Sequence, residues 1–259
     1  MIDKYSNKFS IRVDVDTSDG MAEGMPKLLE IFDRYDIHAN IYVVMGPDKN
    51  FHVLRKRFGL VKAVYNLAHG LPKYVARNNP KVVDLLLQGK HFLSPHGWDH
   101  QKYCLMRLTQ EEKKSEFDQA VAEFIRVFGF KPASYLFPCD KIDADGIAFA
   151  TEHEMKYMSY NPHSFTEARP YWENGIFFLP ILPFYDGDMI FRHDTDEKIL
   201  KLYLSYVDMC LEHDTICSIA IHPCQIGSKD NYLVIVDKLL AYVRSKGMEN
   251  LTINRLAEL

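Results

Sequence analysis

The stretch Phe9–Gly20, FSIRVDVDTSDG, decides the fold. Apolar residues occupy alternate positions along it, namely Phe9, Ile11, Val13 and Val15. This period of two predicts a β-strand, and the polar run from Asp16 to Gly20 ends that strand.

Asp14 and Asp16 are two residues apart, so a strand places both on the same side of the sheet. Two carboxylates held that close repel each other unless a cation or a shared proton offsets the repulsion. Asp16 and Asp19 also suit the capping of a turn, whereas Asp14 lies inside the apolar alternation and fits a turn poorly. We therefore interpret the pair as half of a metal site, with turn chemistry as the alternative.

The composition is that of a globular protein, with 47% hydrophobic and 25% charged residues among 259. A net charge of only −4 argues against general binding to nucleic acid. Neither a signal peptide nor an apolar run of bilayer length is evident, so we expect a cytoplasmic protein. The five cysteines are odd in number and lack a CxxC pair, which argues against a disulfide framework and against a thiolate zinc site.

Strand and helix patterns alternate along the chain, which predicts parallel β-strands and one barrel-like domain over residues 1–259. Residues 51–80 break the alternation and are interpreted as an insertion. After the first strand, the expected strands are Ala39–Met45, His91–Ser94, Ala133–Phe137, Tyr157–Tyr160, Gly175–Ile181, Ile216–Ile221 and Leu251–Ile253. The expected helices are Ala22–Tyr35, Pro80–Gln88, one from the capping box at Thr109 to Gly129, Asp145–His153, Asp196–Glu212 and Asn231–Ser245.

His96 and His100 follow a predicted strand directly, four residues apart, so that on a helical turn they face the same way. Two imidazoles and one carboxylate make a set of three ligands that leaves positions open for water and substrate. Zinc is the expected ion, with cobalt, nickel or manganese as alternatives. Each histidine could instead be a structural residue whose ring nitrogens are hydrogen-bonded.

A metal ion held in this way activates water, and a carboxylate that is not a ligand can accept the proton of that water. One aspartate of the DVD pair suits this role. His222, which follows the apolar strand SIAIH, could protonate a departing amine from the opposite side.

Three runs, in this order and on alternating strands, resemble the polysaccharide deacetylase superfamily: DVDT at 14–17, HGWDH at 96–100 and IHP at 221–223. This superfamily is also called the NodB-homology or carbohydrate esterase family four fold. The resemblance implies a distorted (β/α)₇ barrel that removes acyl groups from amino sugars. Further runs resemble the formamido-arabinose phosphoundecaprenol deformylase group: Arg12–Thr17, Gly24–Glu30, Gly46–Asp48 with Asn50, His96–His100 and Leu182–Asp186.

Position by position, the resemblance implies that Asp14 is the general base and His222 the general acid. It implies that Asp16, His96 and His100 hold the metal ion. The third motif of the superfamily carries an arginine, where this chain has Asp140-Lys141-Ile142-Asp143. We expect the substrate to contact Lys141, in place of that arginine, together with Asp143, Trp98 and Tyr185. The aspartate that orients the acid histidine is not evident at Met158–Asn161.

The predicted function is therefore that of a metal-dependent amidohydrolase, which removes a formyl or acetyl group from an amino sugar. The sugar is expected on a polyprenyl phosphate or a nucleotide. One alternative interprets DVD as the DxD motif of a glycosyltransferase, which leaves His96, His100 and His222 without a role. Another alternative, suggested by the altered third motif, is a non-catalytic sugar-binding relative.

Residues 51–80 combine six cations, followed directly by Lys81, with apolar residues and contain no acidic residue. The cations between Phe51 and Lys81 are Arg55, Lys56, Arg57, Lys62, Lys73, Arg77 and Lys81. Such a segment is commonly a solvated helix that packs its apolar stripe on the domain. The alternative is an element that contacts the anionic inner leaflet and receives a lipid-linked substrate.

Overall fold

A parallel sheet with β1 at its centre organises the computed structural model, which describes residues 4–68, 70–162, 168–181, 186–191, 195–226 and 231–259. The strand order is β3-β2-β1-β7, and β8 pairs with the start of β1. The bounds are β1 Lys8–Val15, β2 Asn40–Val43, β3 Phe92–Pro95, β7 Cys217–Ile221 and β8 Glu249–Asn250. The strand predicted from the opening stretch is therefore confirmed, and it lies between two parallel neighbours.

The second sheet has the order β4-β6-β5, with bounds Tyr157–Tyr160, Ile176–Pro180 and Tyr171–Glu173 respectively. The strand predicted at Ala133–Phe137 is wrong, because only Ser134 forms a bridge, to Tyr157. The segment instead divides its hydrogen bonds between the two sheets: Leu136 N donates to Pro95 O over 3.0 Å, and Lys156 N donates to Ala133 O over 2.8 Å. It thereby links β3 to β4 without forming a ladder of its own.

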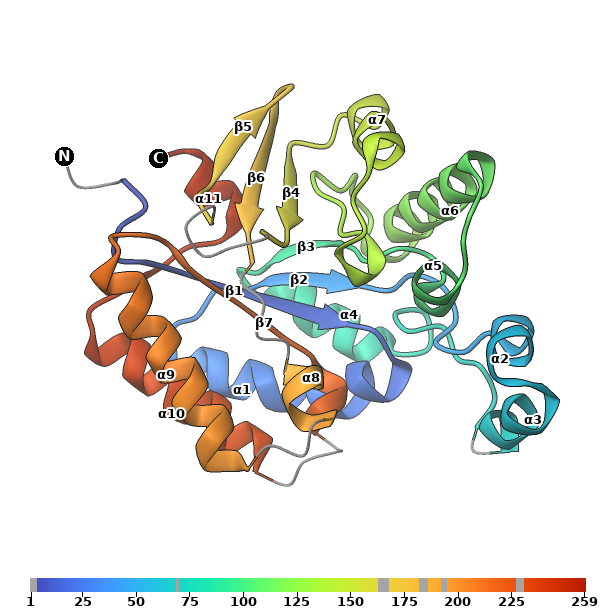
Figure 1. The fold of residues 1–259 in the computed structure, drawn as a ribbon, viewed down its shortest axis with the longest axis horizontal. Coiled ribbons are helices and arrows are strands. Elements are labelled where there is room, and N and C mark those ends of the chain that lie inside the picture. The colour runs from blue at the N-terminus through green and yellow to red at the C-terminus, as the bar shows by residue number, and fades with distance from the viewer. Residues whose placement is uncertain (1–3, 69, 163–167, 182–185, 192–194, 227–230) are drawn as a thin grey trace.

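Helices surround these sheets (Figure 1). Their bounds are α1 Met25–Tyr35, α2 Phe51–Phe58, α3 Leu60–Ala68, α4 Pro80–Gln88, α5 His100–Leu105, α6 Gln110–Phe128, α7 Ala144–Glu152, α8 Asp186–Phe191, α9 Asp196–Glu212, α10 Tyr232–Ser245 and α11 Ile253–Ala257. The predictions for α4 and α9 are confirmed residue for residue, and the capping box at Thr109 opens α6 as expected. None of the helices in the described part of the chain is both long enough and apolar enough to cross a membrane.

The strand predicted at Leu251–Ile253 is also wrong, because α11 begins at Ile253. The Asn40 side chain accepts a hydrogen bond from Ile253 N over 2.7 Å, and Leu251 N donates the last ladder bond to Phe9 O. A side chain on β2 therefore ends the strand three residues earlier than the apolar pattern suggests.

Strand β1 is buried on both faces, and the two faces have opposite chemistry. Its apolar side chains belong to the main core, together with those of Leu28 on α1 and Leu239 on α10. Its other face carries three buried polar side chains, Ser10, Arg12 and Asp14. Unpaired buried charge is costly, so Arg12 and Asp14 must be paired where β1 ends.

Helices α2 and α3 form a hairpin that projects at the edge of the molecule, away from the central strands (Figure 1). Among the residues of α3, only Ala63 is buried. The apolar stripe of α3 is therefore mostly not packed on the domain, whereas Val53 and Leu54 of α2 and the later residue Val75 are buried, as the commoner interpretation of the sequence expects. The large side chains that are exposed are those of Phe58, Leu60, Val61, Val64, Tyr65 and Leu71.

Candidate metal centre

Asp16, His96 and His100 converge as the sequence predicts, at the carboxyl ends of β1 and β3. Asp16 Oδ1 lies 3.3 Å from His96 Nε2 and 3.6 Å from His100 Nε2. One ligand atom from each of the three residues lies within 4.8 Å of the others. The arrangement offers one carboxylate and two imidazoles to a single point.

The protonation of His96 supports a cation at this point. Its Nδ1 lies 3.1 Å from the carbonyl oxygen of Leu136, which can only accept a hydrogen bond, so Nδ1 carries a proton. In the neutral ring, Nε2 then directs a lone pair toward Asp16 Oδ1. That oxygen is buried and has no hydrogen-bond partner among the residues that the structure describes. The lone pairs of His96 Nε2 and Asp16 Oδ1 repel each other when they face across an empty space. A divalent ion between the two atoms would be bound by both lone pairs.

Electrostatics keep Asp16 ionised for such an ion. Burial alone would raise the pKa of Asp16, but His100, His96 and His222, when their rings are protonated, hold it well below the ordinary value of 3.8. A nitrogen, nitrogen and carboxylate set suits zinc and other first-row divalent ions, and magnesium less well. The residues present therefore fit the metal-dependent chemistry that the resemblance implies.

The backbone conformation around Gly97 and Asp99 orients the two histidines. Gly97 has φ +77°, and a Cβ at this position would lie 2.6 Å from the Pro138 ring. A residue with a side chain there would be strained and would collide, so glycine lets the chain turn between β3 and α5. Asp99 caps α5 by accepting a hydrogen bond from Lys102 N over 2.8 Å, which places His100 in the first turn.

Asp14 is held by an arginine that the sequence reasoning did not identify. Arg12 Nη2 donates to Asp14 Oδ2 over 2.7 Å, and Arg12 Nη1 donates to Asp140 Oδ1 over 2.8 Å. All three side chains are at least 95% buried, so the pairing is shielded from water. Arg12 on β1 is thus the arginine that lies beside Asp14, and the segment in which the resemblance leads us to expect an arginine supplies Asp140 as its second partner.

Lys141 does not take the place of that arginine. Its ammonium donates to the carbonyl oxygen of Cys104 over 2.7 Å, at the end of α5. Asp143 caps α7 by accepting a hydrogen bond from Gly146 N. Lys141 and Asp143 border a different depression from the one around Asp16, and Trp98 borders a third. Tyr185 lies outside the described residues.

His222 lines the same cavity as the two histidines, with Nε2 at 3.8 Å from both Asp14 Oδ2 and Asp16 Oδ2. Its Nδ1 is 2.5 Å from Asp186 Oδ1, and Asp186 also accepts hydrogen bonds from His222 N and from the Tyr232 hydroxyl. Burial alone would lower the pKa of His222, but the carboxylate of Asp186 above all, with those of Asp16 and Asp14, raises it to about 10. Asp186 is thus the aspartate that was not evident at Met158–Asn161, and the quoted run Leu182–Asp186 contained the signal.

One cavity of about 380 Å³ joins these groups. Its lining consists of Arg12, Asp14, Asp16, His96, His100, Cys139, Asp140, Asn161, His222 and Gln225. Five of these residues were predicted as catalytic or metal-binding, and the cavity brings all five together. Asn161 and Gln225 are further polar groups at its wall that sequence reasoning missed.

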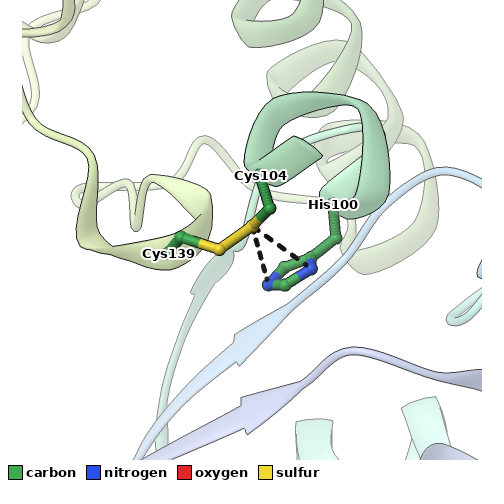
Figure 2. Close-up of side chains that lie close together, drawn as sticks. All are labelled: His100, Cys104 and Cys139. Atoms are coloured by element: carbon green, nitrogen blue, oxygen red, sulfur yellow. Dashed lines mark hydrogen bonds between the residues drawn. A yellow bond between two sulfur atoms is a disulfide. The ribbon is translucent and has the colours of Figure 1, made fainter. Parts of the chain in front are cut away.

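Cys104 and Cys139 form a disulfide beside this cavity, which the odd cysteine count did not predict (Figure 2). The two residues are 35 positions apart, and the tertiary fold brings their Cα atoms to 5.8 Å. Cysteine number and spacing cannot reveal a pairing that depends on the meeting of α5 with the turn Pro138–Asp140.

Comparisons with known proteins agree with this geometry. The sequence profile of the polysaccharide deacetylase family matches residues 15–158. Over 222 residues the chain is 30% identical to the probable 4-deoxy-4-formamido-L-arabinose-phosphoundecaprenol deformylase ArnD of Shewanella sediminis (strain HAW-EB3). That alignment covers 75% of this chain and 71% of the relative.

Two solved structures share the fold at low sequence identity. A probable polysaccharide deacetylase from Pseudomonas aeruginosa PAO1 has a TM-score of 0.66 at 12% identity, over 96% of this chain and 89% of its own. Puue allantoinase has a TM-score of 0.69 at 14% identity, over 96% and 88% respectively. The predicted fold class, a distorted (β/α)₇ barrel of the NodB type, is confirmed. With the profile match covering more than half of its length, the chain belongs to the polysaccharide deacetylase family.

Proposed function

We propose that this protein is a metal-dependent hydrolase that removes the N-acyl group of an amino sugar. The observation that carries the proposal is the single cavity shared by Asp14, the Asp16–His96–His100 set and His222. Such a set provides an ion site, a proton acceptor and a proton donor within a few ångströms of one another. Metal-assisted amide hydrolysis uses these three components. Zinc is the ion we propose, with cobalt, nickel and manganese as competitors.

Asp16, His96 and His100 would hold the ion. When bound, such an ion lowers the pKa of water and polarises the carbonyl of the acyl group. The second imidazole nitrogen of His96 donates to the Leu136 carbonyl, and this bond fixes the ring so that Nε2 faces the ion.

Asp14 is the proposed general base. Its Oδ2 is occupied by the Arg12 guanidinium, whereas Oδ1 is buried and has no hydrogen-bond partner among the described residues. Oδ1 is therefore the atom placed to accept the proton of the attacking water. Arg12 orients the carboxylate, and Asp140 in turn orients Arg12.

His222 is the proposed general acid. Asp186 accepts the hydrogen bond of Nδ1 and favours the imidazolium, so Nε2–H is directed at the cavity. That proton can pass to the amine as the carbon–nitrogen bond breaks, on the side opposite to His96 and His100.

A lipid-linked amino sugar is the substrate class that we favour. The relative from Shewanella sediminis is named for a formamido-arabinose on phosphoundecaprenol, and the α2–α3 hairpin suits contact with a lipid surface. Val61 and Leu71 are 83% and 74% exposed, and Arg55, Lys56, Arg57 and Lys62 have no acidic partner among the described residues. Apolar side chains beside unpaired cations fit the anionic inner leaflet of a membrane, each cation contributing about 1 kcal/mol near its surface.

The hairpin also borders the region next to the proposed metal centre. A second cavity of about 340 Å³ is lined by Asn66 of α3 and by Thr17, the residue after Asp16. We propose that a substrate whose carrier lies in the membrane approaches the site past this second cavity.

The test is release of free amine from matched substrates by metal-loaded protein. The panel contains N-formyl and N-acetyl amino sugars, each carried on a polyprenyl phosphate and on a nucleotide. We expect turnover of a lipid-linked member, lost with a chelator and restored by zinc. A protein that binds these sugars but releases no amine with any of the four ions would be a non-catalytic relative. Transfer of sugar from a nucleotide would support the glycosyltransferase hypothesis.

A further inference from the structure

The imidazole of His100 belongs to two groups of side chains that could bind a metal ion. One group contains Asp16 and His96, and the other contains Cys104 and Cys139, whose disulfide lies beside the His100 ring (Figure 2). Cys104 follows His100 by one turn of α5, and its Sγ lies 3.7 Å from Nδ1 and 3.9 Å from Nε2 of the ring. One ligand atom each from His100, Cys104 and Cys139 lies within 4.8 Å of the others.

The disulfide withholds two ligands from this second group, because bonded sulfur atoms cannot act as thiolates. A dithiol reductant breaks the sulfur–sulfur bond by supplying two electrons and two protons, and is itself oxidised to its own disulfide. Cys104 and Cys139 then each carry a thiol. Two thiolates and one imidazole form a recognised zinc ligand set that leaves a fourth position open, and binding releases both thiol protons.

We propose that reduction of the Cys104–Cys139 disulfide creates a second metal site, made of His100, Cys104 and Cys139, for zinc or a similarly soft divalent ion. Because both sites need the same imidazole, an ion held by the thiolates withdraws His100 from Asp16 and His96. The second site rests on its own residues, and only the competition rests on the proposed function.

Contacts other than the disulfide keep the two sulfurs close after reduction. Lys141 Nζ donates to the Cys104 carbonyl over 2.7 Å, which ties the end of α5 to the residue that follows the turn Pro138–Asp140. Asp140 is anchored by Arg12 on the other side of that turn. Cys139 and Asp140 both have left-handed backbone angles, φ 58° and 50°, and such costly conformations persist where the surroundings fix them.

The disulfide is also open to a reductant. Cys139 is exposed and lines the cavity of the proposed metal centre. By contrast, Cys210 and Cys217 are buried, and Cys224 is partly buried. In a compartment that keeps thiols reduced, the thiolate site would be the prevailing form.

Cobalt binding tests the proposal on the full chain. One sample is kept oxidised, and the other is treated with a dithiol that is then removed without oxygen. Titration of the denatured samples should find three thiols before reduction and five after it, because three cysteines are free in the structure. We expect cobalt to produce a thiolate-to-metal charge-transfer absorption in the reduced sample and none in the oxidised one.

Variants assign this absorption to its ligands. Cys104→Ser and Cys139→Ser should each abolish it, whereas Cys224→Ser, a matched change at a cysteine outside the group, should retain it. His96→Ala should retain the absorption of the reduced protein and abolish cobalt binding by the oxidised protein. This variant separates failure of the thiolate site from failure of the first metal centre.

Three outcomes would overturn the inference. One is a fully reduced protein without the charge-transfer absorption, and another is an absorption that survives the Cys104→Ser and Cys139→Ser changes together. Binding of two cobalt ions per reduced chain would overturn the sharing of His100. Five thiols in the protein as purified, with the absorption present on addition of cobalt, would support the site directly.

Discussion

Strand β1 and the α2–α3 hairpin place charged and apolar side chains in opposite ways. In β1, Arg12 and Asp14 are buried and paired, while the apolar side chains fill the main core. In the hairpin, Val61 and Tyr65 are exposed, and the cations of Arg55 to Arg57 face no acid among the described residues. Buried charge is costly, and its presence is typical of a functional site. Exposed apolar surface is also costly, and its presence is typical of a surface that contacts another protein or a membrane.

The largest effect is expected at the buried charge of β1. Asp14→Asn should lower turnover by about 10² to 10⁴-fold, because the variant lacks the proton acceptor. Bound metal, measured in the same preparations, should stay close to that of the wild type. Asp19→Asn is the matched control, since this exposed carboxylate lies just beyond β1 and pairs with Lys73. Loss of metal together with activity in Asp14→Asn would exchange its role with that of Asp16.

The second prediction concerns the stability of the same network. Arg12→Met leaves the buried carboxylates of Asp14 and Asp140 without the guanidinium, and should lower the free energy of unfolding by about 3–5 kcal/mol. Denaturant unfolding of metal-free protein measures this effect. Arg34→Met is the control, because Arg34 pairs with Asp237 at the surface, where a salt bridge contributes about 0–1 kcal/mol. Equal losses in the two variants would contradict the buried-charge argument.

The third prediction tests Asp186 through pH. In metal-free protein the pKa of His222 is about 10, above its ordinary value of 6.5. The protonated ring therefore stabilises the fold fully below about pH 6.5, and this stabilisation is lost as the pH rises through about 10. Asp186→Asn should lower the pKa of His222, as followed by the NMR shift of its ring protons, and should flatten this pH dependence.

Asp208→Asn is the matched control for this change, because Asp208 also accepts a tyrosine hydrogen bond, from Tyr242, but is exposed. We expect it to leave the titration of His222 in place. A His222 titration that is the same in Asp186→Asn as in the wild type would show that the carboxylate does not control the ring.

The smallest effect on the fold is expected in the hairpin. Changing Arg55, Lys56 and Arg57 together to glutamine should alter the free energy of unfolding by no more than about 0.5 kcal/mol per residue. Binding to anionic vesicles should nevertheless fall, and wild-type binding should weaken as salt is added. Exchanging Lys198 and Lys201 on α9 for glutamine is the control. Vesicle binding that is independent of both lipid charge and these residues would remove the membrane from the proposed function.

Local patterns in the sequence were sufficient to predict much of the fold and many residues of the candidate site. The alternation in Phe9–Val15 predicted β1, and the spacing of Asp14, Asp16, His96 and His100 predicted which side chains would converge. These predictions succeeded because strand period, helix period and turn residues act over a few positions. The runs around these residues were also sufficient to indicate the family.

Only the tertiary structure decided which groups support the site. Arg12 reaches Asp140 across 128 positions, Asp186 reaches His222 across 36, and Cys104 meets Cys139 across 35. The same long-range contacts left Lys141 at the end of α5 and turned the predicted strand at Ala133–Phe137 into a link between two sheets. Pairing of buried charges and closing of backbone hydrogen bonds depend on which distant segments the fold brings together, and a local sequence pattern carries no record of that proximity.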